Sequence, residues 1–141
     1  MQINHLTPGY AVSPQIEISD VAALKAAGFT TVICNRPDHE VPPIQQSKSI
    51  RPVVEAAGLR FVMNPVEAGT VGQDAVPEQE AAMAADTGKV FAYCRSGTRS
   101  SVVWALCMAG QMQVDDIIGA GRKAGYDLSG LRAYLESTGR A

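Results

Sequence analysis

The chain has 141 residues, of which 46% are hydrophobic and 18% charged. This length predicts one domain, residues 1–141, large enough to bury a core without a disulfide or a metal, and the composition argues against disorder. Its 12 Lys and Arg, 14 Asp and Glu and net charge of −2 include no basic run, so we expect no nucleic-acid partner. The apolar runs are too short for a bilayer, and the N-terminus lacks a secretory-signal pattern. We therefore expect a cytoplasmic protein with no membrane partner.

Short apolar runs alternate with helical patterns, which is typical of a mostly parallel sheet flanked by helices. We expect the N-terminal residues around His5 to be mobile, and the first helix to run from Ser19-Asp20 to Ala27 before Gly28. Strands are predicted at residues 29–34, 59–63 and 89–93. Further helices are predicted at about 47–57, 74–85, 100–109, 114–124 and 129–137.

The three cysteines, Cys34, Cys94 and Cys107, do not predict a disulfide framework. With only two histidines, no Cys/His set has the spacing of a zinc site, so we expect neither a metal nor another cofactor. Cys107 is expected in the core. Cys34 ends a strand, where it is either a resolving thiol for Cys94 or simply buried.

The segment after the third predicted strand carries the candidate catalytic residues. A cysteine leaves an apolar strand, and the chain turns through a glycine into a helix: Cys94-Arg95-Ser96-Gly97-Thr98-Arg99-Ser100-Ser101. Gly97 permits backbone angles that let successive amides face an anion, while the helix N-terminus and Arg99 supply positive charge. Such surroundings lower the pKa of a thiol. We therefore predict an ionised, nucleophilic Cys94 with Ser100 hydrogen-bonded to its sulfur, and substrate contacts from Arg95, Ser96, Gly97 and Thr98.

This segment resembles two groups of enzymes, the protein tyrosine and dual-specificity phosphatases and the rhodanese-like sulfurtransferases. Four residues separate Cys94 from Arg99, as in the rhodanese loop, whereas the phosphatase signature has five. Residues 24–33 and 59–66 resemble the phosphatase body instead. Residues 32–38, 94–100 and 124–128 are similar to the DUF442 family, the phosphatase-like domain of beta-lactamase-hydrolase-like proteins, and the similarity covers nearly the whole chain. The resemblance implies a phosphatase-like α/β fold with a central, mostly parallel sheet flanked by helices.

Two reactions and one inactive role fit this segment. The shorter loop makes a smaller ring of amides, which suits one sulfane sulfur better than the three oxygens of a phosphoryl group. Some members of the family are fused to a metallo-β-lactamase-like sulfur dioxygenase, which implies persulfide chemistry. Our preferred hypothesis is therefore rhodanese-like sulfur transfer through a Cys94 persulfide, with a small anionic or sulfur-donor substrate. The alternatives are a phosphatase-type hydrolase working through a phosphocysteine and an inactive anion-binding regulatory module.

The phosphatase reaction also needs a general acid. The resemblance places that acid after the strand at 59–63, where Glu67 is the nearest candidate and Asp74 the next. Tyr93 stands where the phosphatases usually have a histidine. Arg36 follows the strand at 29–34, at the sheet edge where Cys94 is expected, so it either contacts the substrate or forms a surface ion pair. The sequence does not distinguish a monomer from an oligomer.

Overall fold

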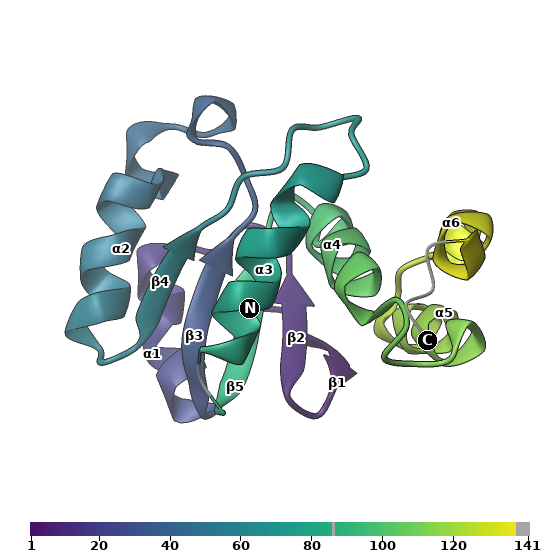
Figure 1. The fold of residues 1–141 in the computed structure, drawn as a ribbon. Coiled ribbons are helices and arrows are strands. Elements are labelled where there is room, and N and C mark those ends of the chain that lie inside the picture. The colour runs from purple at the N-terminus through teal and green to yellow at the C-terminus, as the bar shows by residue number, and fades with distance from the viewer. Residues whose placement is uncertain (86, 138–141) are drawn as a thin grey trace.

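The computed structural model describes residues 1–85 and 87–137, which fold around one five-stranded sheet (Figure 1). The strands lie in the order β1-β2-β5-β3-β4. β1 is antiparallel to β2, whereas β2, β5, β3 and β4 run parallel to one another. The strands are β1 (Asn4–Thr7), β2 (Tyr10–Ser13), β3 (Phe29–Cys34), β4 (Arg60–Met63) and β5 (Lys89–Tyr93).

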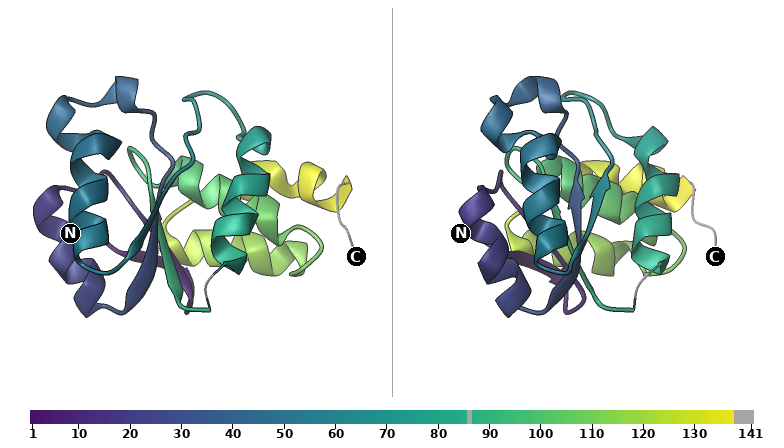
Figure 2. Two further views of the ribbon diagram at one scale, coloured as in Figure 1. Left: turned by 60° about the vertical axis from the view of Figure 1, so that its left-hand side comes forward. Right: turned by 90° about the vertical axis from the view of Figure 1, so that its left-hand side faces the viewer.

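Helices cover both faces of the sheet (Figure 2). One layer is made of α1 (Val21–Ala26) and α2 (Ser47–Ala56). On the other side lie α3 (Val76–Ala84), α4 (Thr98–Met108), α5 (Val114–Ala124) and α6 (Arg132–Ser137). Among the described residues, no helix is both long enough and apolar enough to span a bilayer.

Side chains of the central strands alternate between two cores, as expected for strands buried on both faces. Val32 and Phe91 pack with α1 and α2. Ile33 and Ala92 point the other way and pack in a cluster with Trp104 of α4. Trp104 is therefore a core residue, and the sheet lies between two apolar layers.

The predicted α/β fold, with a central, mostly parallel sheet flanked by helices, is confirmed, with three of its strands and all its predicted helices close to their predicted places. The prediction is wrong at the N-terminus, where residues 4–13 form β1 and β2. His5 is not mobile but lies in β1, with its ring stacked 6.2 Å from that of Phe29. β2 is only four residues long and entirely buried, so it shows no alternation by which sequence reasoning recognises a strand.

The parallel strands place four connecting segments at one edge of the sheet. β2, β3 and β4 end there, as their arrows in Figure 1 show, and β5 ends there too because it is parallel to β2 and β3. Pairing of β2 with β5 continues past the strands, because the Cys94 amide donates to the Ser13 carbonyl (3.4 Å) and the Gln15 amide donates to the Arg95 carbonyl (3.2 Å). The Cys94 segment is thus attached to the sheet before it turns into α4. This edge is where ligands bind in open α/β sheets.

Candidate active site

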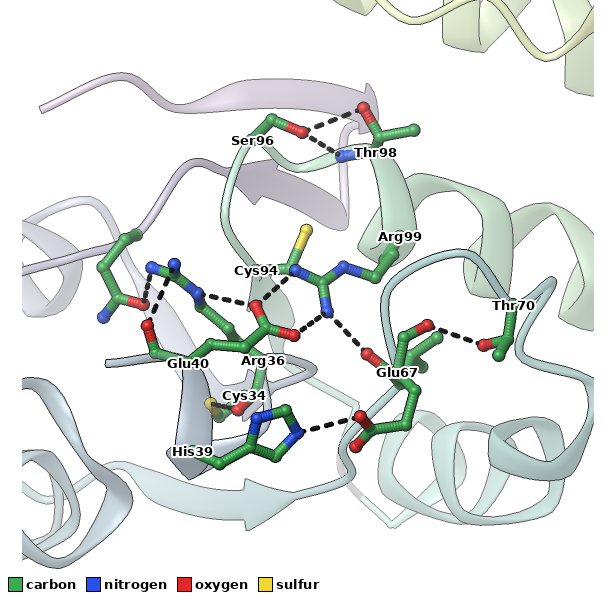
Figure 3. A network of polar contacts seen from close by, with 12 residues as sticks. Cys34, Arg36, His39, Glu40, Glu67, Thr70, Cys94, Ser96, Thr98 and Arg99 are labelled. Carbon is green, nitrogen blue, oxygen red and sulfur yellow. Dashed lines mark hydrogen bonds and ion pairs between the residues drawn. The ribbon is translucent and has the colours of Figure 1, made fainter. Parts of the chain in front are cut away.

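Cys94 lies between the end of β5 and the start of α4, and only 1% of it is exposed. The Gly97 amide donates a hydrogen bond to its sulfur, with an N···S distance of 3.1 Å. The amide therefore donates directly to the sulfur of the candidate nucleophile. The buried sulfur, the amide and the beginning of α4 form the centre of the site (Figure 3). We refer to residues 94–99 as the Cys94 loop.

Gly97 adopts a conformation that other residues rarely take. Its φ is +96°, in the left-handed region, and a side chain at this position would overlap the hydroxyl of Tyr126. Both constraints come from the turn that aims the Gly97 amide at the sulfur. Glycine is therefore required here by conformation and by space.

We expect Gly97→Ala to destabilise the protein by about 1–3 kcal/mol and to displace the Cys94 loop, because alanine is strained at this φ and its methyl group meets Tyr126. Urea unfolding measures the loss of stability, and the rate of alkylation of Cys94 reports the displacement. Gly28→Ala is the matched control, since Gly28 also has a positive φ (+91°) but would place its methyl group at ordinary contact distance, 3.8 Å from Lys89. If both variants lost the same free energy of unfolding, the contact between the added methyl group and Tyr126 would not contribute to the effect of Gly97→Ala.

Arg99 lies in the first turn of α4 and is fixed by three acceptors. Its Nη1 donates to Glu40 Oε2 (2.8 Å) and to the Val66 carbonyl (2.7 Å), and its Nη2 donates to Glu40 Oε1 (2.8 Å). A guanidinium has five N–H groups, so within the described residues these bonds leave Nε–H and one Nη2–H for the side of Cys94. The bond to Glu40 is the main cause that raises the pKa of Arg99, and Cys94 acts in the same direction.

Glu40 is the carboxylate that orients this arginine. The hydrogen bond from Arg99 is the largest cause that lowers its pKa, from 4.5 to about 2, and Arg36 contributes as well. Glu40 is therefore an anion at all ordinary pH values. It sets the guanidinium plane and partly neutralises the arginine without competing for its remaining N–H groups.

The lowered pKa of Glu40 predicts a specific acid dependence of stability. Because the folded-state pKa is below the unfolded one, the ion pair stabilises the fold above about pH 4.5, and this contribution is lost as the pH falls towards about 2. In Glu40→Gln we expect a lower free energy of unfolding near neutral pH and a smaller decrease across this acid range, both measured by urea unfolding. Glu55→Gln, which removes the exposed partner of Arg51, should follow the wild-type curve. A parallel decrease in Glu40→Gln and wild type would contradict the assignment.

Arg36 supports Glu40 from the other side. Its Nε donates to Glu40 Oε1 (3.1 Å) and its Nη1 to Gln15 Oε1 (3.2 Å), and 14% of its side chain is exposed. Of the two predicted roles, the structure shows the ion pair, although a largely buried one. Contact between Arg36 and a substrate stays a prediction.

Ser100 faces the protein interior. Its hydroxyl donates to Asn35 Oδ1 at 2.9 Å, so in the described part of the chain its proton goes to Asn35 rather than to Cys94 as predicted. Asn35 in turn donates to the Asn64 carbonyl (2.8 Å) and to Gln79 Oε1 (3.0 Å), and the Gln79 amide donates to the Tyr10 hydroxyl (2.7 Å). This buried network joins β2, β3 and α3 to the start of α4 and holds the floor of the site.

The other predicted loop residues lie at the surface of the site. Arg95, Ser96 and Thr98 are exposed, and the Ser96 hydroxyl links to Thr98 through its hydroxyl (3.0 Å) and amide (3.3 Å). These two bonds fix the first turn of α4. Arg95 and the hydroxyls are thus accessible to a substrate that approaches Cys94.

Of the two candidate general acids, Glu67 lies away from the sulfur. Glu67 is exposed and accepts a hydrogen bond or ion pair from His39, with an Nε2···Oε1 distance of 2.8 Å. In Figure 3 this pair and the Cys94 sulfur are on opposite sides of the Arg99–Glu40 ion pair. Asp74 is exposed in a short 3-10 turn, Gln73–Ala75. The loop that carries both carboxylates is tied to the site by Arg99 through the Val66 carbonyl.

Cys34 fits the second of its two predicted roles, that of a buried cysteine. Its thiol contacts the Arg36 carbonyl at 3.3 Å, and burial is the main cause that raises its pKa to about 11. A thiol that stays protonated at neutral pH is a poor resolving nucleophile. Cys107 is fully buried beside Val103, as predicted.

Residues 2–125 match the model of a family described as the phosphatase-like domain of beta-lactamase hydrolase-like proteins. The chain belongs to this family. It is 32% identical over 127 residues to the beta-lactamase hydrolase-like protein of Agrobacterium fabrum, which covers 89% of this chain and 30% of that protein. The chain spans about a third of the length of the curated relatives it matches.

Solved structures agree with this membership. A candidate phosphatase from Neisseria meningitidis Z2491 has a TM-score of 0.82 and 33% identity, covering 97% of this chain and 98% of its own. Kinase-associated phosphatase, with its catalytic-site cysteine replaced by serine, has a TM-score of 0.71 and 13% identity, covering 97% of this chain and 93% of its own. The second likeness shows the fold alone. The chain therefore has a phosphatase-like domain, and its wider similarity is to phosphatases.

Proposed function

We propose that the chain is a phosphatase-type hydrolase that forms a phosphocysteine at Cys94. This reverses the order of preference drawn from loop length. It is supported by the family to which the chain belongs and by its structural likeness to phosphatases. The observation that carries it is the arrangement of Arg99, whose three bonds to Glu40 and Val66 leave two N–H groups beside Cys94.

The remaining Arg99 N–H groups and the start of α4 together favour a tetrahedral oxyanion next to the sulfur. A planar fork of donors suits two oxygens of a phosphoryl group, and helix N-termini bind such anions through their amides and partial positive charge. Arg95, Ser96 and Thr98 are exposed around the loop and supply further donors. We therefore propose a small anionic phosphomonoester as the substrate class.

In the first step the Cys94 thiolate attacks phosphorus, an S–P bond forms, and the P–O bond to the leaving group breaks. The leaving oxygen takes a proton, for which Glu67 and Asp74 are the candidates on the loop after β4. In the second step water attacks phosphorus, the S–P bond breaks, and inorganic phosphate leaves as the thiolate is restored. Arg99 stabilises the charge on the phosphoryl oxygens in both steps.

Sulfur transfer is the second candidate, and the spacing of the loop favours it. Four residues between Cys94 and Arg99 make a smaller ring than the phosphatase signature. In this reaction the thiolate attacks the outer sulfur of a donor such as thiosulfate, the S–S bond breaks, sulfite leaves, and Cys94 becomes a persulfide. A nucleophile such as cyanide then takes the outer sulfur and restores the thiolate.

The two reactions leave different groups on Cys94, so one pair of assays separates them. The protein is incubated with p-nitrophenyl phosphate, or with thiosulfate and cyanide, and turnover is followed together with the intact mass after rapid acid quench. Phosphate release with a phosphoryl adduct on Cys94 supports the hydrolase. Thiocyanate formation with a one-sulfur adduct, and no phosphate release, overturns it in favour of sulfur transfer. No turnover in either assay overturns both and leaves an anion-binding module.

A further inference from the structure

We propose that Tyr126, supported by Asn4, is a positioning residue that locks the peptide between Ser96 and Gly97 so that its N–H faces Cys94. Tyr126 lies after α5, some 30 residues from the Cys94 loop, and is 9% exposed. Nothing in the proposed reaction requires it to touch a substrate. The inference rests on the proposed function only in taking Cys94 as the nucleophile.

The contacts of Tyr126 define its action. Its hydroxyl donates to the Ser96 carbonyl (3.0 Å) and accepts a hydrogen bond from Asn4 Nδ2 (2.9 Å). Because Asn4 occupies the hydroxyl as a donor, the single phenolic proton is directed at Ser96. The same hydroxyl lies against Gly97, where an added methyl group would overlap it. Tyr126 therefore holds both sides of the Ser96–Gly97 peptide.

That peptide connects Tyr126 to the sulfur. The Ser96 carbonyl and the Gly97 N–H belong to one planar unit, and in a trans peptide they point in opposite directions. The N–H donates to the Cys94 sulfur at 3.1 Å while the carbonyl accepts from Tyr126. A hydrogen bond at the carbonyl also polarises the peptide and strengthens its N–H as a donor.

Without this lock, the peptide has an accessible alternative. Glycine populates both positive and negative φ, so the peptide before Gly97 can rotate and turn the Ser96 carbonyl towards the sulfur. A carbonyl oxygen beside a thiolate disfavours the charged form. Tyr126 opposes this rotation because it would break the bond to the Ser96 carbonyl. The hydroxyl thus supports the charge on Cys94 without contacting the sulfur.

The test measures the ionisation of Cys94 directly. The rate of iodoacetamide alkylation of Cys94, resolved by peptide mapping, is recorded against pH for the wild type and for Tyr126→Phe, which keeps the ring and removes the hydroxyl. We expect the midpoint of the profile to rise by about one pH unit, because a Gly97 N–H that turns away no longer donates a hydrogen bond to the charged sulfur, and kcat/KM near neutral pH to fall about tenfold. Asn4→Ala should shift the midpoint in the same direction by less.

Thr30→Val is the matched control, because it also removes one hydroxyl, here bound to the Lys89 carbonyl at the far edge of the sheet (3.3 Å). Its alkylation midpoint should equal that of the wild type. If Tyr126→Phe does not fold, Asn4→Ala decides the question, since it leaves Tyr126 in place. An unchanged midpoint in the folded variant overturns the inference. A shifted midpoint in a protein without phosphatase turnover overturns the proposed function and leaves the inference standing.

Discussion

Cys94→Ser is expected to reduce kcat for phosphomonoester hydrolysis by at least about 10⁴-fold, the scale of losing a covalent nucleophile. Serine has nearly the same shape, but its hydroxyl stays protonated at neutral pH, so the Gly97 amide and Arg99 have no anion to stabilise until a substrate arrives. The buried site should otherwise be unchanged. Initial rates with p-nitrophenyl phosphate measure the loss, and titration with inorganic phosphate measures whether the variant still binds the anion.

Cys107→Ala is the control for this variant, because it removes a different buried thiol, which lies in α4 and packs against Val103 in a separate cluster. It should retain activity. Substantial hydrolysis by Cys94→Ser, with the protein folded, would exclude a phosphocysteine. Loss of both activity and phosphate binding would show instead that the sulfur is needed to shape the anion site.

The contiguous part of the site could be predicted from sequence. Cys94, Gly97 and Arg99 lie within six residues, and a strand, a turn and a helix suffice to bring them together. Three of the parallel strands could also be predicted from sequence, because each is an apolar run followed by a turn. Local chemistry thus identified the Cys94 loop correctly as a unit of structure, while the role of Cys94 as a nucleophile and the reaction it performs stay predictions.

The partners that orient this unit come from distant segments, and no local pattern in the sequence indicated their contacts with it. Glu40 is 59 residues from Arg99, Asn35 is 65 residues from Ser100, and Tyr126 is 30 residues from Ser96. Each pair becomes adjacent only in the folded chain. The prediction that Ser100 bonds to the sulfur was wrong for the same reason. The acceptor of the Ser100 hydroxyl is Asn35, which follows β3 and meets α4 only in the folded chain.

The same long-range partners explain why we expect the arginine itself to be required. Arg99→Lys is expected to lower kcat/KM about 10²–10³-fold, the scale of losing a donor to a developing oxyanion, although it keeps the positive charge. A lysine has three N–H donors, and the two Glu40 oxygens and the Val66 carbonyl already engage three from Arg99. A lysine that satisfies these acceptors has none left for a phosphoryl group, and one that turns to the substrate abandons Glu40.

Steady-state kinetics with p-nitrophenyl phosphate test this argument, and Arg132→Lys is the matched control because Arg132 forms exposed ion pairs with Asp115 and Glu136. Exposed ion pairs contribute little, so that variant should retain wild-type kinetics. The kcat/KM of Glu40→Gln should lie between those of Arg99→Lys and Arg132→Lys, because this variant keeps the guanidinium but orients it less firmly. Full activity in Arg99→Lys would mean that positive charge alone supports the reaction, and that the ordered fork of donors seen in the structure does not hold the transferred group.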